Sequence, residues 1–299
     1  MKKIGIILLN YCNYDLTCEC IESINRSIFH DYEIIVVDNN SPDGSGEKLA
    51  QLKNIKFLQL KDNLGFAAGN NKGIEIALSN GCEYIMLLNN DTIIEKAMIK
   101  ELIQKANENT VVAPKMYYYD VKGSADTIWY AGGILKYISS DGIHIGAKKK
   151  DSEEYSYEKK ITFATGCCMM IHKSIIERVG MLREEYFMYC EDTDYSIRLN
   201  KEKINILYVP TAKLWHRVSS SSGGEMSKFI VYYVVRNKIY CAVVNKLGLK
   251  SYLYIITETL YRTLKACCGK YYSNYSIAPI ALWDGLIKKM GKTYMGKVK

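Results

Sequence analysis

The N-terminal third of the chain alternates short apolar runs with stretches in which apolar positions recur at helical spacing. Four runs have the length of buried strands, at residues 4–9, 33–37, 56–60 and 84–88. Helical patterns separate them at residues 16–28, 46–52 and 69–79. This alternation predicts an α/β fold, in which a mostly parallel sheet is flanked by helices.

The remainder of the chain has a looser pattern. Strand-like runs are expected at residues 111–116, 165–172 and 206–209, and a helix opening at residues 191–199. A further helix is expected to begin at Ser174, because Ser174 and Glu177 have the spacing of a capping box. Between these elements, residues 117–160 indicate a variable insert that lies over the edge of the sheet.

A serine-glycine segment at residues 219–224 is the best candidate for a linker. Helical patterns follow it near residues 227–246 and 250–267. We therefore expect two domains, a main α/β domain over residues 1–220 and a helical extension over residues 221–299.

Polar clusters follow four of the predicted strands directly, at residues 10–11, 38–45, 63–71 and 89–92. Because ligands of parallel sheets bind outside the carboxyl ends of the strands, one ligand is expected to contact all four. Ordinary turn chemistry at residues 38–45, and close packing of a glycine-rich helix near Gly69, stay open as alternatives. The candidate binding residues are Asn10, Tyr11, Asp38, Asn40, Asn63, Gly69, Asn70, Asn90 and Asp91.

Asp91 is also a candidate metal ligand. It follows Asn89 and Asn90 at the end of a buried strand, and oxygen ligands of this kind suit Mg²⁺ or Mn²⁺. His216 is the candidate second ligand. The alternatives are a helix N-cap for Asp91 and a structural role for His216.

Three carboxylates lie together at the start of the predicted helix at residues 191–199: Glu191, Asp192 and Asp194. The helix dipole favours ionised carboxylates at this end, so they are candidates for a general base. Simple N-terminal capping is the alternative reading. Neither a dinucleotide-binding glycine fingerprint nor a P-loop motif occurs in the chain.

Charge divides the chain unevenly. Residues 225–299 hold 13 Lys and Arg against three Asp and Glu, so this segment carries +10 while the whole chain carries +8. Apolar stretches at 229–235 and 252–256 alternate with Lys246, Lys250, Arg262 and Lys265, as in helices that lie on anionic membranes. We expect peripheral membrane contact, with a solvated helix face or a second subunit as alternatives. Nucleic acid is not an expected partner, because the aromatic residues are nearly all Tyr within apolar helical runs.

No run approaches the ~18 apolar residues of a spanning helix, and residues 2–10 lack the length and cleavage site of a signal peptide. The chain is therefore expected in the cytoplasm, peripheral on the inner face of the cell membrane. The ten cysteines are scattered without zinc-ligand spacing, which favours buried free thiols in a reducing compartment.

Taken in order along residues 4–240, several motifs resemble those of bacterial family 2 glycosyltransferases, particularly the branch that includes rhamnosyltransferases. They are VVDNNSPDGS (36–45), NLGFAAGNNKGI (63–74), LLNNDT (87–92), the run from ATGCCMMIH to EDTDYSIR, WHR, and YYVVRN (232–237). The resemblance implies a GT-A fold, a nucleotide-diphospho-sugar donor, UDP- or dTDP-linked, a divalent metal ion, and inversion at the anomeric carbon.

The resemblance also implies roles for single residues. Asp38 would contact the nucleotide, Asn63 and Asn70 would line the donor site, and Asp91 and His216 would hold the metal ion. Asp192 would be the catalytic base, with Glu191 and Asp194 positioning the acceptor or the base. The chain departs from the family pattern twice, with Asn89 in place of the first Asp of a DXD motif and Arg183 where an Asp is usual.

Two hypotheses follow. The first is a metal-dependent hexosyltransferase, with rhamnose as the family-level expectation, that extends a lipid-linked glycan during synthesis of a cell-surface polysaccharide. The second is a catalytically degenerate protein that binds nucleotide sugars as a scaffold in a glycan-assembly complex. Retention of Asp91, Asp192 and His216 favours the first.

Overall fold

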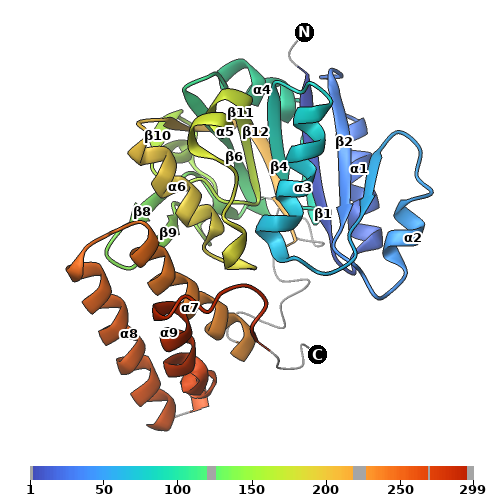
Figure 1. Ribbon diagram of the computed structural model, residues 1–299. Helices are drawn as coiled ribbons and strands as arrows, with labels where there is room; N and C mark the ends of the chain where they lie inside the picture. The colour runs from blue at the N-terminus through green and yellow to red at the C-terminus, as the bar shows by residue number, and fades with distance from the viewer. Residues whose placement is uncertain (1–2, 120–125, 218–226, 269, 295–299) are drawn as a thin grey trace.

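The computed structural model describes residues 3–119, 126–217, 227–268 and 270–294. The predicted linker at 219–224, and with it the predicted domain boundary, lies outside these residues. A large central sheet carries the main part of the described molecule, and a group of helices lies below it (Figure 1).

Within the described residues, the central sheet has ten strands. β5 (Thr92–Ile94) pairs with β12 and β7 (Ile128–Tyr130) pairs with β6, outside the main path. Only β10 and β11 run antiparallel to their neighbours on that path, so the expectation of a mostly parallel α/β sheet is confirmed. The path runs through β10 (Lys159–Ile161), β12 (Asn205–His216), β6 (Thr110–Tyr118), β11 (Cys168–His172), β4 (Tyr84–Leu88), β1 (Ile4–Asn10), β2 (Tyr32–Asp38) and β3 (Lys56–Gln59).

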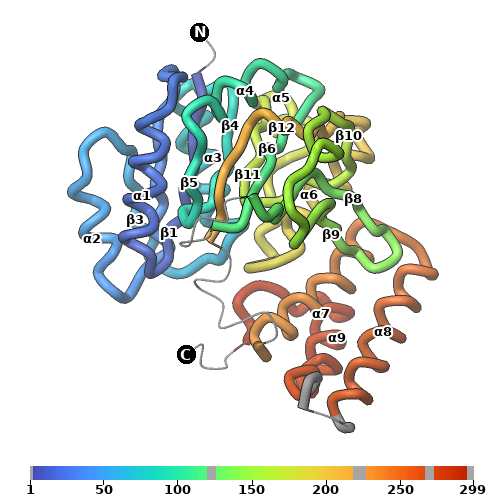
Figure 2. The backbone as a smooth tube through the Cα atoms, turned by 180° about the vertical axis from the view of Figure 1, so that it is seen from behind, coloured from blue at the N-terminus to red at the C-terminus, as the bar shows by residue number. Residues whose placement is uncertain are grey.

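Helices cover both faces of the sheet. α3 (Gly65–Ser79) and α6 (Glu191–Lys201) lie in front of it in Figure 1, whereas α1 (Tyr14–Asn25) lies in front in the reversed view of Figure 2. The strands between these layers are therefore buried on both faces, which explains why they are continuous runs of Ile, Leu and Val. α2 (Ser45–Leu49), α4 (Met98–Lys105) and α5 (Lys173–Val179) are shorter.

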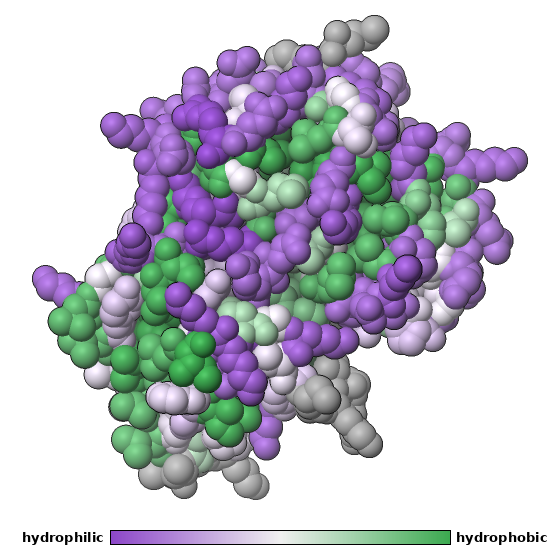
Figure 3. Space-filling model, viewed as in Figure 1, coloured by the Kyte–Doolittle hydropathy of each residue, from purple (hydrophilic) through white to green (hydrophobic). Residues whose placement is uncertain are grey.

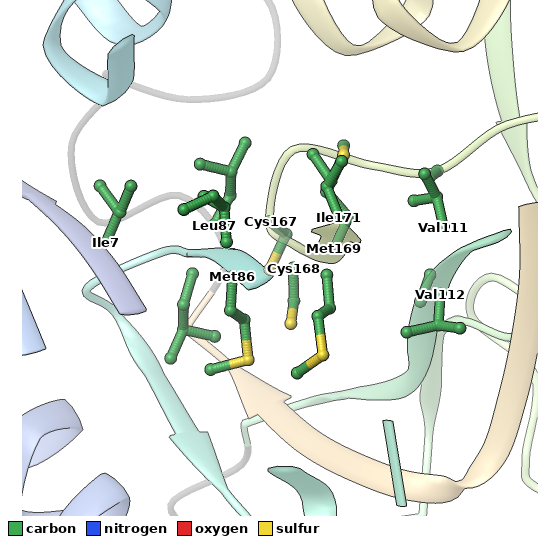
Figure 4. Close-up of a cluster of buried hydrophobic side chains, with 14 of the residues drawn as sticks. Ile7, Met86, Leu87, Val111, Val112, Cys167, Cys168, Met169 and Ile171 are labelled. Carbon is green, nitrogen blue, oxygen red and sulfur yellow. The ribbon is translucent and has the colours of Figure 1, made fainter. Parts of the chain in front are cut away.

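The interior of the sheet is filled by side chains from β1, β4, β6 and β11. Figure 4 shows Ile7, Leu87 and Ile171 on one side of the sheet, with Met86 and Val112 on the other. The cysteines that the structure describes are free thiols, and Cys20, Cys167 and Cys168 among them are buried in this core. Their place agrees with the prediction of buried free thiols.

Glycines in α3 allow the helix to approach β1 closely. A Cβ atom added at Gly69 would lie 2.5 Å from Leu9 Cδ1, and one added at Gly73 would lie 2.4 Å from Ile7 Cγ2. Gly69 was a candidate for ligand binding, but the side it leaves open faces the sheet. The packing alternative therefore accounts for Gly69.

One local prediction is wrong, and a predicted strand is too short. α5 begins at Lys173, and its N-cap is His172, whose Nδ1 accepts a hydrogen bond from Ser174 N at 3.3 Å. The expected capping box of Ser174 and Glu177 does not form, because Ser174 already lies inside the first turn. The strand predicted at 206–209 instead continues as β12 to His216, past an irregularity between Val209 and Lys213.

The predicted insert at 117–160 contains regular structure. Besides β7 and β10 it holds a hairpin of β8 (Gly133–Lys136) and β9 (Asp141–His144), followed by the short 3-10 helix η1 (Glu153–Tyr155). Strands of three or four residues are too short for their periodicity to be recognised in a sequence.

The C-terminal helices form a second hydrophobic core. We call α7 (Lys228–Val244), α8 (Leu249–Cys268), η3 (Lys270–Ile277) and α9 (Ala278–Leu286) the helical unit. The stretch at 229–235, predicted to meet a membrane, is largely buried inside this unit, with Tyr233 fully buried. Phe187 from the loop before α6 packs into the same core, so the helical unit holds part of the main domain.

Candidate functional site

The carboxyl ends of β1, β2 and β3 end level with one another. In the register of the sheet, Asn10 pairs with Asp38, and Asp38 pairs with Gln59. Asn10 Nδ2 donates to Asp38 Oδ1 at 2.6 Å, and Gln59 Nε2 donates to Asp38 Oδ2 at 2.7 Å. Ser41 adds a backbone and a hydroxyl donor. Asp38 is fully buried, so its carboxylate fixes the loop after β2 from inside the protein.

The loop after β4 is tied to the same network. Asn90 Nδ2 donates to Thr17 Oγ1 at 2.7 Å and to Asn10 Oδ1 at 3.3 Å. Asn10 and Asn90 are both buried. Of the remaining candidates in these first clusters, Tyr11 is 41% exposed and Asn40 lies on the surface with a positive φ of 60°. We call this edge of the sheet, at the carboxyl ends of its strands, the rim. A ligand bound above the rim can reach Tyr11 and Asn40 directly.

Asn63 stands at the start of α3. Its Oδ1 accepts from Gly65 N at 2.9 Å and from Asn39 Nδ2 at 3.0 Å. Asn39 was not among the predicted site residues, although it lies inside the predicted polar cluster. Asn70 is buried, and its amide donates to Phe66 O one turn earlier. Its side-chain donor therefore stays inside α3, and the predicted place of Asn70 in a donor site stays a prediction.

Asp91 and His216 lie side by side. β5 pairs antiparallel with β12 so that His216 is opposite Thr92, and this brings the preceding Asp91 next to the imidazole. His216 Nε2 lies 3.1 Å from Asp91 Oδ1, and Asn89 Nδ2 lies 3.4 Å from the same nitrogen. Two residues far apart in the sequence thus meet at one point of the rim.

The Asp91–His216 pair fits a divalent metal ion. Two neighbouring ligands of an octahedral ion with bonds of about 2.1 Å lie about 3.0 Å apart, close to the observed spacing. In the described ranges no group of three His, Cys, Asp or Glu side chains could hold a metal ion. With Asp91 and His216 as its two protein ligands, such an ion would take other oxygen atoms to complete its shell, as is usual for Mg²⁺.

Asp192 lies in the first turn of α6. Its Oδ2 accepts from Gly166 N at 3.0 Å, and its Oδ1 accepts from Thr193 N at 2.7 Å. Cys167, the residue after Gly166, accepts a hydrogen bond from Asn89 N through its backbone oxygen at 2.8 Å. The segment Gly166–Cys167, just before β11, therefore links Asp192 to the loop that carries Asp91. The carboxylate therefore belongs to the same rim.

Burial raises the pKa of the Asp192 carboxyl above its ordinary value. Burial raises the pKa of Glu191 as well, and the adjacent charge of Asp192 adds to this shift. Glu191 is buried, and its Oε2 has no hydrogen-bond partner among the residues that the structure describes. A carboxylate with a raised pKa, fixed by backbone N–H groups, is suited to accept a proton.

Asp194 occupies a different environment. It is 0% exposed, and its oxygens accept from Arg183 Nη1 at 2.6 Å, Arg198 Nε at 2.8 Å and Asn245 Nδ2 at 2.6 Å. The hydroxyl of Tyr186 donates to it as well. Asp194 therefore joins α6 to neighbouring segments in the interior. Its predicted role, positioning the acceptor or the base, stays a prediction.

The loop before α6 is held by the helical unit. Phe187, Tyr189 and Cys190 all have positive φ, between 64° and 69°, which is costly for residues other than glycine. Asn237 Nδ2 lies 2.7 Å from Met188 O, 2.8 Å from Tyr189 O and 3.1 Å from Tyr186 O.

Arg236, also fully buried, donates to Tyr186 O at 2.8 Å. On its other side, the loop accepts a hydrogen bond from Phe66 N through Phe187 O. The sequence alone does not predict these roles of Arg236 and Asn237, although both residues lie in the motif YYVVRN.

Aromatic residues of the insert border the rim. The ring of Trp129 lies 4.5 Å from that of His216 and 4.5 Å from that of His144, edge to face in both cases. Burial lowers the pKa of His144 to about 4, so this imidazole is neutral at physiological pH. The insert therefore forms one wall beside the Asp91–His216 pair. Neither Trp129 nor His144 was singled out in the sequence.

Comparison with known proteins agrees with this geometry. Residues 4–180 match the model of glycosyl transferase family 2. The chain is 27% identical over 241 residues to the low-salt glycan biosynthesis hexosyltransferase Agl10 of Haloferax volcanii, covering 80% of this chain and 75% of the relative. It is 24% identical to an N-acetylglucosaminyl-diphospho-decaprenol L-rhamnosyltransferase of Mycobacterium tuberculosis, covering 74% and 78%.

Among solved structures, the fold resembles GalNAc-T7 crystallised with UDP, GalNAc and Mn²⁺, with a TM-score of 0.61 at 12% identity. The alignment covers 97% of this chain and 55% of that chain, so this chain spans little more than half of that structure. At this identity the likeness concerns the fold alone.

Proposed function

Because the chain belongs to glycosyl transferase family 2, we propose that it is an inverting enzyme that uses Asp192 as its base. The substrates are a nucleotide-diphospho-sugar and a hydroxyl group of a glycan. The observation that carries the proposal is the rim itself, where Asp192 and the Asp91–His216 pair are joined through the Gly166–Cys167 segment.

The proposed reaction is a single displacement. Asp192 takes the proton of the acceptor hydroxyl, and the acceptor oxygen forms a bond to the anomeric carbon. The bond from that carbon to the diphosphate oxygen breaks, and the nucleoside diphosphate leaves with the electron pair. Attack from the side opposite the leaving group inverts the configuration.

Asp91 and His216 would hold a divalent ion, Mg²⁺ or Mn²⁺. Such an ion, when bound, neutralises negative charge that develops on a diphosphate leaving group. The surrounding chain orients these two ligands, since β5 and β12 fix them in register and Asn89 lies against the imidazole.

The donor we propose is a UDP- or dTDP-sugar, with rhamnose as the sugar because the mycobacterial relative is named a rhamnosyltransferase. The mycobacterial relative is named for a diphospho-decaprenol acceptor, which supports a lipid-linked glycan as the acceptor here. No described helix has the length and apolar character needed to cross a membrane. A peripheral position at the inner face of the cell membrane fits such an acceptor, with a homo-oligomer as a further option.

A thermal-shift screen tests the donor and metal assignments. UDP-, dTDP- and GDP-sugars are added with and without Mn²⁺. Saturation at 100 times Kd stabilises the folded protein by about 2.7 kcal/mol. We expect a shift for one nucleotide that increases with Mn²⁺. Asp91→Ala should remove the Mn²⁺-dependent part, whereas Glu22→Ala, an exposed carboxylate at the far end of α1, should not.

The absence of any shift for all three nucleotides would contradict the proposed donor class. A shift that is identical in wild type and Asp91→Ala would contradict the metal assignment alone. A shift in the wild type together with no turnover on any acceptor would favour the degenerate scaffold.

Asn237→Ala is expected to lower kcat by about 10²-fold, because it releases the strained loop that positions Glu191 and Asp192. The loss of its hydrogen bonds should also lower the free energy of unfolding by about 1–3 kcal/mol. Steady-state kinetics and urea unfolding measure the two effects.

The matched control is Ile239→Ala, two residues further along α7, which truncates a fully buried side chain of the helical core. It should cost about 2–5 kcal/mol of stability yet leave kcat of the folded enzyme nearly unchanged. If kcat falls equally in both variants, Asn237 contributes to general stability and does not position the base.

A further inference from the structure

Large apolar side chains are exposed mainly on one part of the molecule. In the described ranges, 17 such residues are exposed, and 13 of them lie on the helical unit, at its edge, or on the β8–β9 hairpin. The catalytic sheet and its helices carry only four, Tyr11, Ile28, Leu64 and Tyr157. Since a soluble surface scatters such residues singly, their concentration marks an interaction surface.

On α8 the exposed apolar residues form a stripe along the helix. Leu253, Leu260 and Leu264 are spaced by seven and four residues, and Leu264 is 68% exposed. The opposite side, with Ile255 and Thr259, is buried against the rest of the helical unit. The stripe therefore faces outward because the packing of α8 directs it there.

A second stripe lies on α9 and just beyond it. Ile280, Trp283 and Ile287 recur at helical spacing, and Trp283 is 61% exposed. Ala278, Ala281 and Leu282 face the core of the unit. Figure 3 shows hydrophobic surface gathered over α8 and α9 on the face of the molecule seen in Figure 1.

The β8–β9 hairpin extends this surface toward the rim. Ser251 Oγ lies 3.1 Å from the backbone oxygens of both Tyr137 and Ile138, which holds the tip of the hairpin against α8. The hairpin also carries exposed Ile134 and Ile143. At its end, His144 contacts Trp129, which in turn contacts His216. The apolar surface thus reaches the wall of the candidate site.

Between residues 246 and 292 of the helical unit, the exposed charge of the described residues has one sign, and Asp141 of the hairpin is ion-paired with Lys238. Glu258 is ion-paired with Arg262, and Asp284 is buried, so between 246 and 292 the described residues include no exposed carboxylate. Such a surface repels a second copy of itself, which disfavours a symmetric dimer through this face. The exposed basic residues are Lys246, Lys250, Lys265, Lys288, Lys289 and Lys292.

We propose that α8, α9 and the β8–β9 hairpin form one docking face for an anionic lipid bilayer. Leucine, isoleucine and Trp283 side chains enter the interface, and the surrounding lysines contact anionic headgroups. The face consists of residues other than the apolar stretch at 229–235. The inference that this face brings a lipid-linked acceptor to the rim rests on the proposed function. Docking of the face to a bilayer does not depend on that function.

Co-sedimentation of the full chain with vesicles tests the docking face. Wild type is expected to sediment with vesicles of phosphatidylglycerol and phosphatidylcholine, and about tenfold or more weakly with phosphatidylcholine alone. The combined variant Leu253→Gln, Leu264→Gln, Trp283→Gln should lose about tenfold or more of the binding. Glutamine keeps helix propensity near that of leucine, so the variant should fold, as thermal unfolding will verify.

The matched control replaces Ile28 and Tyr157, which are equally exposed on the main domain, with glutamine and should bind like wild type. Equal sedimentation of the combined variant and wild type would overturn the proposal. So would sedimentation equilibrium without vesicles that shows a wild-type dimer and a monomeric variant, because the face would then be a subunit interface. Asp192→Asn should bind vesicles normally, so failure of the catalytic proposal is separately visible.

Discussion

Asp192→Asn is expected to reduce kcat by about 10²- to 10⁴-fold while nucleotide-sugar binding is retained. Asparagine keeps an oxygen that can accept from Gly166 N, so the start of α6 should stay in place. It cannot take a proton from the acceptor hydroxyl. Steady-state kinetics with a saturating donor, and the thermal shift caused by that donor, measure the two effects separately.

The pH profile gives a second readout for the same variant. A base works only when it is deprotonated, and burial raises the pKa of Asp192 in the folded protein. In wild type, kcat/KM should therefore decrease as the pH falls through this raised pKa, whereas the residual rate of Asp192→Asn should lack this decrease. A variant with wild-type kcat, or with the same acidic limb, would show that another group is the base.

Asp194→Ala is expected to have the largest effect on stability, a loss of about 3–5 kcal/mol in the free energy of unfolding. The substitution leaves the partly buried Arg183 and Arg198 without their shared carboxylate and removes the acceptor of Asn245. Breaking a buried ion pair in this way is costly because charge stays buried without compensation. Urea unfolding followed by circular dichroism measures the change.

Glu75→Ala serves as the surface control, because its ion pair with Lys72 on α3 is solvent-exposed and should matter little. Asp192→Asn is the positional control, since it changes a carboxylate two residues away on the same helix. If Asp194→Ala unfolds at the same urea concentration as wild type but loses turnover, Asp194 acts in the reaction and the interior role is wrong.

Asp192 and Asp194 show what can and cannot be predicted from the sequence of α6. Residues two apart on an α-helix point about 200° away from each other, so only one of them can face the rim. The order of residues does not say which, because this depends on what packs against α6. Arg183, Arg198 and Asn245 come from three different segments and surround Asp194, which leaves Asp192 beside Gly166.

The strands also differ in how well the sequence predicts them. β1, β2 and β4 were predicted within two residues of their ends, because short continuous runs of branched aliphatic side chains are typical of strands that are buried on both faces. β5 has three residues and no period of its own. It is a strand because it pairs with β12, and that pairing is what brings Asp91 to His216.

The sequence alone therefore determined the order of most of the longer strands and helices, the edge of the sheet that carries the polar clusters, and the resemblance to family 2 glycosyltransferases, because these depend on local pattern. Only the tertiary structure decided which of these polar groups are buried supports, as Asp38 and Asn70 are, and which face the rim. It also decided that the stretch at 229–235 forms a core while Leu264 and Trp283 face outward. Burial and the direction of a side chain depend on contacts between distant segments, and no local pattern encodes them.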